Sequence, residues 1–235
     1  NNNKKGNNKR NKTEKVLFYK TPPELLNING INVLMIPNKL SGSLKVQCTM
    51  FGGNYLENSQ NYGIAHLLEH LLMSSSKHCK KNLCETYLNK YGIKSNASTH
   101  DMYTNYWALG LPEYKNEILN FVTSIILDPK ITEKILKREK EAVKHELEGV
   151  LNNPDTELVN QIYKKFYKPL SYKNSINYKK QLEILKTIDM TKINNYLKKT
   201  RVKNCLMFTI SGNFNKKEIV EYFKKLKIPT TKEKC

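Results

Sequence analysis

Long apolar runs are absent from this sequence. No stretch approaches the roughly 20 apolar residues that a membrane-spanning helix requires, so the sequence predicts no membrane span. Hydrophobic residues make up 39% of the 235 residues. This share is low, but it suffices for the core of one well-packed domain, or of two small ones at most. No internal repeat divides the chain.

Cysteine is also scarce. The five cysteines make an odd number and form no C-x-x-C pair, so the sequence predicts no disulfide framework. It favours a reducing intracellular compartment, either the cytoplasm or an organelle matrix. His78, Cys79 and Cys84 are an alternative metal-binding group, but their spacing fits no common zinc knuckle. The five are Cys48, Cys79, Cys84, Cys205 and Cys235.

Acidic residues are about half as frequent as basic ones. There are 21 Asp and Glu against 40 Lys and Arg, which gives a formal net charge of +19. A charge of this size is typical of proteins that bind nucleic acid or an anionic surface. The lysines are scattered among asparagines along the whole chain, however, and do not form one stripe with glycines and aromatic residues. A basic nucleic-acid-binding domain is therefore an alternative interpretation.

The start of the chain differs in composition from the rest. Residues 1–13 hold Asn, Lys, Gly and Arg with almost no apolar content, which predicts a disordered tail. We expect order to begin near Val16 and residues 14–235 to form a single domain. Because the chain begins with Asn instead of Met, we expect a fragment or a processed form, and any targeting peptide upstream lies outside this sequence.

Strands are predicted by alternating apolar residues and by turn signals. Leu44, Val46, Cys48 and Met50 alternate on one face of a predicted strand. Asn29-Gly30 is a hairpin-type turn signal that precedes the predicted strand over residues 31–36. A later strand is rich in Tyr, Thr and Trp, as strands are, and we expect its aromatic residues to belong to the sheet core. The predicted strands span residues 31–36, 44–51, 95–99, 102–111 and 204–211.

Helices are predicted between and after these strands, and the order of elements indicates an α+β domain. We expect a mainly antiparallel sheet packed against several helices. The predicted helices span residues 62–74, 83–91, 112–127, 132–151, 154–167 and 216–226, with two short helical pieces within 182–199.

The helix over residues 62–74 carries the pattern H-x-x-E-H. His66 and His70 are four residues apart, so both imidazoles point the same way and could bind one metal ion. Glu69 lies on a neighbouring edge of that face, close enough to reach a metal-bound water. The pattern is the inverse of the H-E-x-x-H zinc motif. The alternative is an amphipathic helix with polar residues on its outer face, which the flanking leucines disfavour.

A catalytic zinc site needs a third protein ligand and an open position for water. The helix over residues 132–151 contains Glu139 and Glu146, which are seven residues apart and therefore share a face. In this pairing one carboxylate binds the metal and the other orients the site. Glu141, His145 and Glu148, on the same helix, fit a solvated face.

Together these residues resemble the insulinase (pitrilysin-type) zinc metallopeptidases. The shared features are Gly-x-Ala-His-x-x-Glu-His over residues 63–70, Glu146 at 146 − 70 = 76 positions after His70, and Glu139 seven before Glu146. Residues 52–53, 95–99, 103–107 and 211–213 are similar as well. The resemblance covers about residues 30–225, nearly the whole N-terminal catalytic domain of the family.

The resemblance implies roles for individual residues. His66, His70 and Glu146 would bind Zn²⁺, and Glu69 would act as general base on the metal-bound water. Glu139 would belong to the catalytic residues by supporting the site from behind the ligands. In strand 95–99, Asn96 and Ala97 would pair with the backbone of an extended substrate.

The sequence also departs from the family pattern. The helix continues Leu71-Leu72-Met73-Ser74-Ser75-Ser76, where the family usually has an aromatic residue and then a glycine, and we expect this to change the packing of the turn without touching a ligand. Family members enclose the substrate between two related halves, and this chain holds one. The second half would come from residues beyond Cys235 or from a separate subunit.

The predicted function is therefore a zinc-dependent endopeptidase that cleaves short unfolded peptides, in peptide degradation or in targeting-peptide processing. A non-catalytic, peptide-binding partner subunit of the same fold is the first alternative, although such a subunit has no use for intact metal ligands. The net charge of +19 suggests a preference for acidic peptides.

Overall fold

The computed structural model describes residues 21–74, 76, 79, 84–166 and 177–228. Its strands form one sheet in the order β1-β2-β6-β3-β5-β4. Among these strands, β2 and β6 pair in parallel and the other neighbours are antiparallel. The predicted α+β class with a mainly antiparallel sheet is confirmed. The strands are β1 (Glu24–Ile28), β2 (Ile31–Pro37), β3 (Leu44–Phe51), β4 (Lys94–Thr99), β5 (Tyr103–Gly110) and β6 (Leu206–Gly212).

The predicted hairpin turn joins β1 to β2. Asn29 and Gly30 have φ angles of 53° and 79°, and positive φ at both central residues is what a tight two-residue hairpin of type I′ requires. The strand β1 itself was not predicted, because four of its five residues are at least partly exposed and show no apolar alternation. The predicted tail over residues 1–13 and the start of order near Val16 lie outside the described residues.

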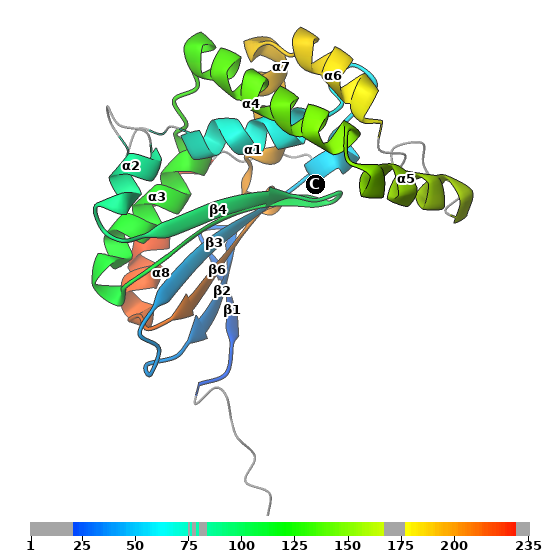
Figure 1. The fold of residues 1–235 in the computed structure, drawn as a ribbon. Helices are drawn as coiled ribbons and strands as arrows, with labels where there is room; N and C mark the ends of the chain where they lie inside the picture. Colours follow the sequence, from blue (N-terminus) through cyan, green and yellow to red (C-terminus); the bar gives the residue numbers. More distant parts are fainter. Residues whose placement is uncertain (1–20, 75, 77–78, 80–83, 167–176, 229–235) are drawn as a thin grey trace, which may run out of the picture.

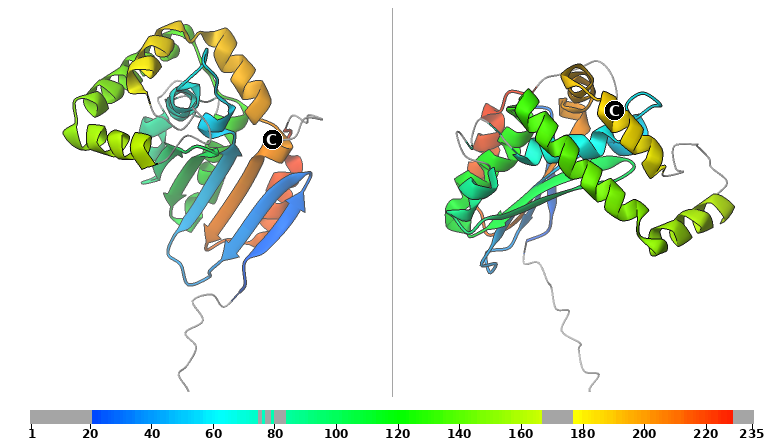
Figure 2. Two further views of the ribbon diagram at one scale, coloured as in Figure 1. Left: turned by 90° about the vertical axis from the view of Figure 1, so that its right-hand side faces the viewer. Right: turned by 45° about the horizontal axis from the view of Figure 1, so that its top comes forward.

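One face of the sheet carries the core. Leu44, Val46, Cys48 and Met50 of β3 are all buried, as their alternation predicted. Phe208 of β6 contacts Phe223 of α8, with ring centroids 5.0 Å apart. The helices α3 and α8 lie against this face, whereas the opposite face is left uncovered by the described helices (Figure 2, left). Burying each large apolar side chain contributes about 1.5–3 kcal/mol.

The helices match the predicted ones closely. Thr132 caps α4 by accepting a hydrogen bond from the backbone N–H of Ile135, and Pro154 opens α5, where its missing N–H does no harm. No described helix has the length and apolar content to cross a membrane. The helices are α1 (Ile64–Ser74), α2 (Cys84–Asn89), α3 (Lys115–Leu127), α4 (Glu133–Leu151), α5 (Pro154–Phe166), α6 (Tyr178–Thr187), α7 (Met190–Thr200) and α8 (Lys216–Lys225).

The helix α1 begins at Ile64, two residues later than predicted. Gly63 has φ of 88°, which is incompatible with a right-handed helix. The buried carboxylate of Glu57 accepts hydrogen bonds from the backbone N–H groups of Gly63 and Ala65, both at 2.9 Å. It thus satisfies donors at the start of the helix. Burial raises the pKa of Glu57 to about 7, although these two hydrogen bonds act in the opposite direction.

Gly53, shortly after β3, lets the chain pass close to the turn between β4 and β5 on its way to α1. Gly53 has φ of 46°, and a Cβ atom there would lie 2.2 Å from the carbonyl oxygen of His100. The same segment hydrogen-bonds to the turn between β4 and β5, through Tyr55 N–H to the oxygen of Asp101 at 2.7 Å. Tyr196 of α7 donates to the carbonyl of Gly53 at 2.6 Å. These contacts fix α1 between the sheet edge β4 and helix α4 (Figure 1).

The expectation of no disulfide is wrong. Cys79 and Cys84 form a disulfide across the link between α1 and α2. An odd cysteine count says nothing about a local pair, and a separation of five residues lets the chain turn back on itself. The bond also removes both sulfurs from the alternative metal-binding group, whose third member, His78, lies outside the described residues. Among the described residues, Cys48 is a buried free thiol whose pKa is raised by burial.

Candidate metal centre

Helix α1 presents His66 and His70 because its opposite side is committed to the core. Four leucines of the helix are fully buried and fix its rotation: Leu67, Leu68, Leu71 and Leu72. The two imidazoles therefore lie on the side that faces α4, with ring centroids 5.0 Å apart. Both are partly exposed, with 32% of the His66 side chain and 19% of the His70 side chain accessible to solvent. The two imidazoles are accessible to a metal ion, and the buried leucines keep them on the side of α1 that faces α4.

Helix α4 brings Glu146 to this pair. Its Oε2 lies 3.3 Å from Nε2 of His66 and 3.5 Å from Nε2 of His70. One ligand atom from each of the three residues lies within 4.8 Å of the others, and this is the one such group of three or more His, Cys, Asp or Glu found in the described part of the chain. The fold thus brings together the three residues predicted as metal ligands, although their role as ligands stays a prediction.

These distances fit a tetrahedral ion. Zinc lies about 2.0–2.2 Å from nitrogen and carboxylate oxygen ligands, so ligand atoms around it are separated by roughly 3.4 Å. The two distances from Glu146 agree with that separation. Two imidazoles and one carboxylate form a donor set that suits zinc, and three ligands leave the fourth position open.

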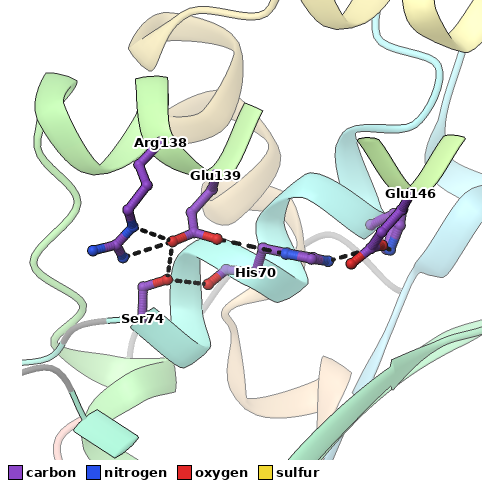
Figure 3. A network of polar contacts seen from close by, with 6 residues as sticks. His70, Ser74, Arg138, Glu139 and Glu146 are labelled. Carbon is purple, nitrogen blue, oxygen red and sulfur yellow. Dashed lines mark hydrogen bonds and ion pairs between the residues drawn. The ribbon is translucent and has the colours of Figure 1, made fainter. Parts of the chain in front are cut away.

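The second glutamate of α4 lies behind His70 (Figure 3). Glu139 is buried, and its Oε2 lies 3.5 Å from Nδ1 of His70, on the side of the ring opposite Glu146. Its Oε1 accepts hydrogen bonds from Ser74 and Arg138. Burial would raise the pKa of Glu139, but the interactions with His70, Ser74 and Arg138 outweigh it and lower the pKa to about 2. Glu139 is therefore an anion that can hold the proton of Nδ1.

The two histidines differ in basicity. The hydrogen bond to Glu139 raises the pKa of His70, against the effect of burial. Burial, followed by the proximity of His70, lowers the pKa of His66. A hydrogen bond from Nδ1 of a histidine to a carboxylate sets the tautomer in which Nε2 carries the lone pair. His70 is thus oriented with Nε2 toward His66 and Glu146.

Glu69 points toward the sheet edge instead of toward α4. The hydroxyl of Thr99, the last residue of β4, donates to Oε2 of Glu69 at 2.5 Å. The sequence predicted Glu69 but not Thr99. A signal was available, because Thr99 ends the strand that was expected to lie beside the site.

Asn96 and Ala97 lie on β4, which is the edge strand of the sheet. The side-chain oxygen of Asn96 accepts the backbone N–H of Ala97 at 2.9 Å, so this N–H is directed away from β5. In an antiparallel pair, the N–H and C=O of one residue point to the same side. Ala97 therefore offers both groups at the open edge, where an added strand would bind.

The departing segment that includes Ser74 was expected to touch no ligand, and Ser74 contacts the main chain of His70 instead of its imidazole. Its hydroxyl lies 2.8 Å from the carbonyl oxygen of His70 and 2.6 Å from Oε1 of Glu139. The sequence could not show this contact, because Ser74 and Glu139 are 65 positions apart on different helices. Arg138 was missed because adjacent positions on a helix do not face each other, so spacing did not predict its bond to Glu139.

The residues expected on a solvated face of α4 lie there. His145 is exposed and pairs with Glu148, and Glu141 pairs with Lys144. On β5, Tyr106 is fully buried, and the Nζ of Lys45 lies over the ring of Trp107 at 5.0 Å from its centroid. The position of Tyr106 agrees with a sheet core, as expected for this strand.

A family model for insulinase (peptidase family M16) matches residues 38–180, more than half of the chain. The chain is 23% identical over 198 residues to a probable mitochondrial-processing peptidase subunit beta of Arabidopsis thaliana, covering 84% of this chain and 37% of the relative. It is 27% identical over 203 residues to an uncharacterized zinc protease of Rickettsia bellii, covering 84% and 48%.

Solved structures give a similar fold. A protease from Helicobacter pylori matches with a TM-score of 0.77 and 20% identity over 91% of this chain and 52% of that one. A peptidase M16 inactive domain from Pseudomonas fluorescens matches with a TM-score of 0.73 and 11% identity over 87% and 50%. At such identities the likeness shows the fold alone. The chain spans about half the length, or less, of the relatives and solved chains that it matches.

Proposed function

Because the chain belongs to the insulinase family of peptidases (peptidase family M16), we propose that it is the metal-bearing half of a zinc-dependent endopeptidase. One observation carries the proposal: Oε2 of Glu146 lies 3.3 and 3.5 Å from Nε2 of His66 and His70, respectively, the separations expected around one tetrahedral ion. The name of the Rickettsia bellii relative, a zinc protease, supports the choice of metal.

In this proposal His66, His70 and Glu146 hold the ion. When bound, zinc would polarise the peptide carbonyl and lower the pKa of water toward about 7. Glu69 takes the proton from the attacking water and passes it to the leaving amine, as a general base and then a general acid do. Thr99 donates to Oε2 of Glu69 and leaves the other carboxylate oxygen for that proton. Glu139 keeps the Nδ1 proton on His70.

The substrate in this proposal is an extended peptide. It adds to the open edge of β4, where Ala97 presents its N–H and C=O and the side chain of Asn96 moves off the N–H that it now caps. Strand addition needs an unfolded backbone, which supports short unfolded peptides as substrates. Peptide degradation and targeting-peptide processing both fit, and the mitochondrial-processing peptidase among the relatives supports the second.

A second half-domain completes the enzyme in this proposal. The matched relatives are about twice as long as this chain or longer, which supports a partner of similar fold in the same chain or in a separate subunit. Residues 14–235 are proposed as one domain.

The proposed compartment is the cytoplasm or an organelle matrix, and labelling of Cys79 and Cys84 by a thiol reagent in intact cells would support it. Protection of both sulfurs would contradict a reducing compartment.

The first test is zinc stoichiometry. We expect about one zinc per chain in the unmodified protein, and loss of the metal in His70→Ala and in Glu146→Gln, because each removes one of three ligands. Glu148→Gln is the matched control, since Glu148 lies two residues further along α4 and pairs with His145 instead. Elemental analysis after dialysis measures the result. Full zinc occupancy in both ligand variants would contradict the site.

A non-catalytic partner subunit is the second candidate. The similarity to the inactive M16 domain of Pseudomonas fluorescens favours it. The two candidates differ in what Glu69→Gln does: an enzyme loses peptide cleavage, whereas a peptide-binding subunit keeps its affinity for extended peptides and its partner's activity.

A further inference from the structure

The two carboxylate oxygens of Glu139 have separate partners. Oε2 contacts Nδ1 of His70 at 3.5 Å, whereas Oε1 accepts every hydrogen bond given to this residue by Ser74 and Arg138 (Figure 3). A carboxylate can rotate about its terminal bond, and this torsion is broad when nothing holds it. The distribution of partners therefore determines which oxygen faces the histidine.

Arg138 grips one oxygen instead of two. Its Nε and Nη2 lie 2.8 and 2.6 Å from the same Oε1. A guanidinium commonly binds a carboxylate with two parallel hydrogen bonds, one to each oxygen. Here that arrangement would occupy the oxygen that His70 uses. Placing both N–H groups on Oε1 leaves Oε2 to the imidazole.

Ser74 holds Oε1 from the other helix. Its hydroxyl is 2.6 Å from Oε1 of Glu139 and 2.8 Å from the carbonyl oxygen of His70, one turn earlier in α1. A hydroxyl has one proton, and the shorter distance to a charged acceptor favours the bond to Glu139. Ser74 thereby links the end of α1 to α4 close to His70, which contacts Glu139 and Glu146 of α4.

We propose that Ser74 and Arg138 are positioning residues for the metal, which act by pinning Oε1 of Glu139 so that Oε2 faces Nδ1 of His70. The ring of His70 is then held with Nε2 toward His66 and Glu146. The inference rests on the proposed zinc site, and it gives a role to Ser74, which lies in the segment where this sequence departs from the pattern of its family.

The test is zinc affinity, measured by competition with a chromophoric chelator on the purified chain. Ser74→Ala removes one hydrogen bond without changing charge, and Arg138→Lys keeps the charge but loses the fork. We expect each to weaken zinc binding about two- to tenfold, and Glu139→Gln to weaken it about 10- to 100-fold. Ser41→Ala and Lys137→Arg are the matched controls: Ser41 bonds within the β2–β3 loop, and Lys137 is exposed beside Arg138.

Double variants decide whether the effect passes through Glu139. In the Glu139→Gln background, Ser74→Ala and Arg138→Lys should produce no further loss, because the residue that they position is already neutral. A further loss of the same size would overturn the inference, as would unchanged affinity in both single variants. If the unmodified chain binds no zinc, both the proposed function and this inference are overturned. If it binds zinc and the single variants bind it equally well, only this inference is overturned. Thermal unfolding of each metal-free variant checks that it is folded.

Discussion

At the scale of single residues, the two glutamates that flank the histidines have different surroundings. Glu69 is partly exposed and faces β4, where Thr99 donates to it. Glu139 is buried and bound by Ser74, Arg138 and His70. A partly exposed carboxylate is accessible to water and to a substrate, whereas Glu139, held by three partners, is placed to orient them. This contrast gives each glutamate a distinct role in the proposed mechanism.

Replacing Glu69 with Gln should separate metal binding from chemistry. We expect Glu69→Gln to lower kcat by about 10²- to 10⁴-fold, because a proton acceptor is lost, while zinc content stays at the unmodified level. The measurement is peptide hydrolysis by the assembled protein, with zinc analysed on the same sample. Loss of zinc in this variant would place Glu69 among the ligands and contradict its role as base.

Glu57 should make stability depend on pH. Its pKa is raised from 4.5 to about 7 by burial, so the folded state binds this proton more tightly than the unfolded state. The stabilisation from this proton is therefore complete below about pH 4.5 and is lost as pH rises through 7, by about 3 kcal/mol at most. Urea unfolding of the metal-free chain at pH 5 and pH 8, compared with Glu57→Gln, measures it. The advantage of Gln over Glu should grow with pH, and a constant difference would contradict the prediction.

At the scale of elements, the predicted helices and strands correspond to observed ones, with boundaries that differ by a few residues. Periodicity places an element because it depends on neighbours three or four residues away in a helix and two in a strand. Ends depend on caps and turns. The start of α1 is set by Glu57 and by the positive φ of Gly63, and neither is visible in an apolar pattern. The strand β1 was missed because four of its five residues are at least partly exposed, so no apolar alternation marks it.

The glycine after β3 offers a test of how α1 is placed. A Cβ atom at Gly53 would clash with backbone atoms of His100, Asp101 and Tyr103, and its φ is positive. We expect Gly53→Ala to destabilise the fold by at least about 1–3 kcal/mol. The matched control is Gly149→Ala, because Gly149 lies in α4 and a Cβ atom there would meet nothing within 4 Å. That change should stabilise the helix by about 0.5–1 kcal/mol. Urea unfolding of both variants compares the effects, and equal stabilities would contradict the clash.

At the scale of the whole molecule, the net charge bears on the expected activity. The net charge is +19, and a field of this sign raises the local concentration of anionic ligands. It does not by itself distinguish an acidic peptide from a nucleic acid. The family membership and the group of His66, His70 and Glu146, which could hold a metal ion, favour the peptide.

The charge should appear in substrate preference. We expect the assembled protein to cleave acidic peptides with a higher kcat/KM than basic peptides of the same length, and this preference should shrink as salt shortens the Debye length from about 10 Å at 0.1 M. Matched peptide pairs assayed at low and high NaCl concentrations provide the measurement. Equal rates for both peptides at low salt would remove charge as a determinant of specificity.

The helix that carries His66, Glu69 and His70 could be predicted from the sequence, as could the shared face of Glu139 and Glu146. Both follow from helical spacing, which is local. The residues that surround this group became known from the packed fold. Arg138 bonds to Glu139, its neighbour on α4, but adjacent positions on a helix do not face each other, so spacing does not predict that bond. Thr99 and Ser74 gain their contacts because β4, α1 and α4 pack together. These two contacts join atoms from elements whose separation is set by the packing of the core, and no periodicity in the sequence encodes that distance.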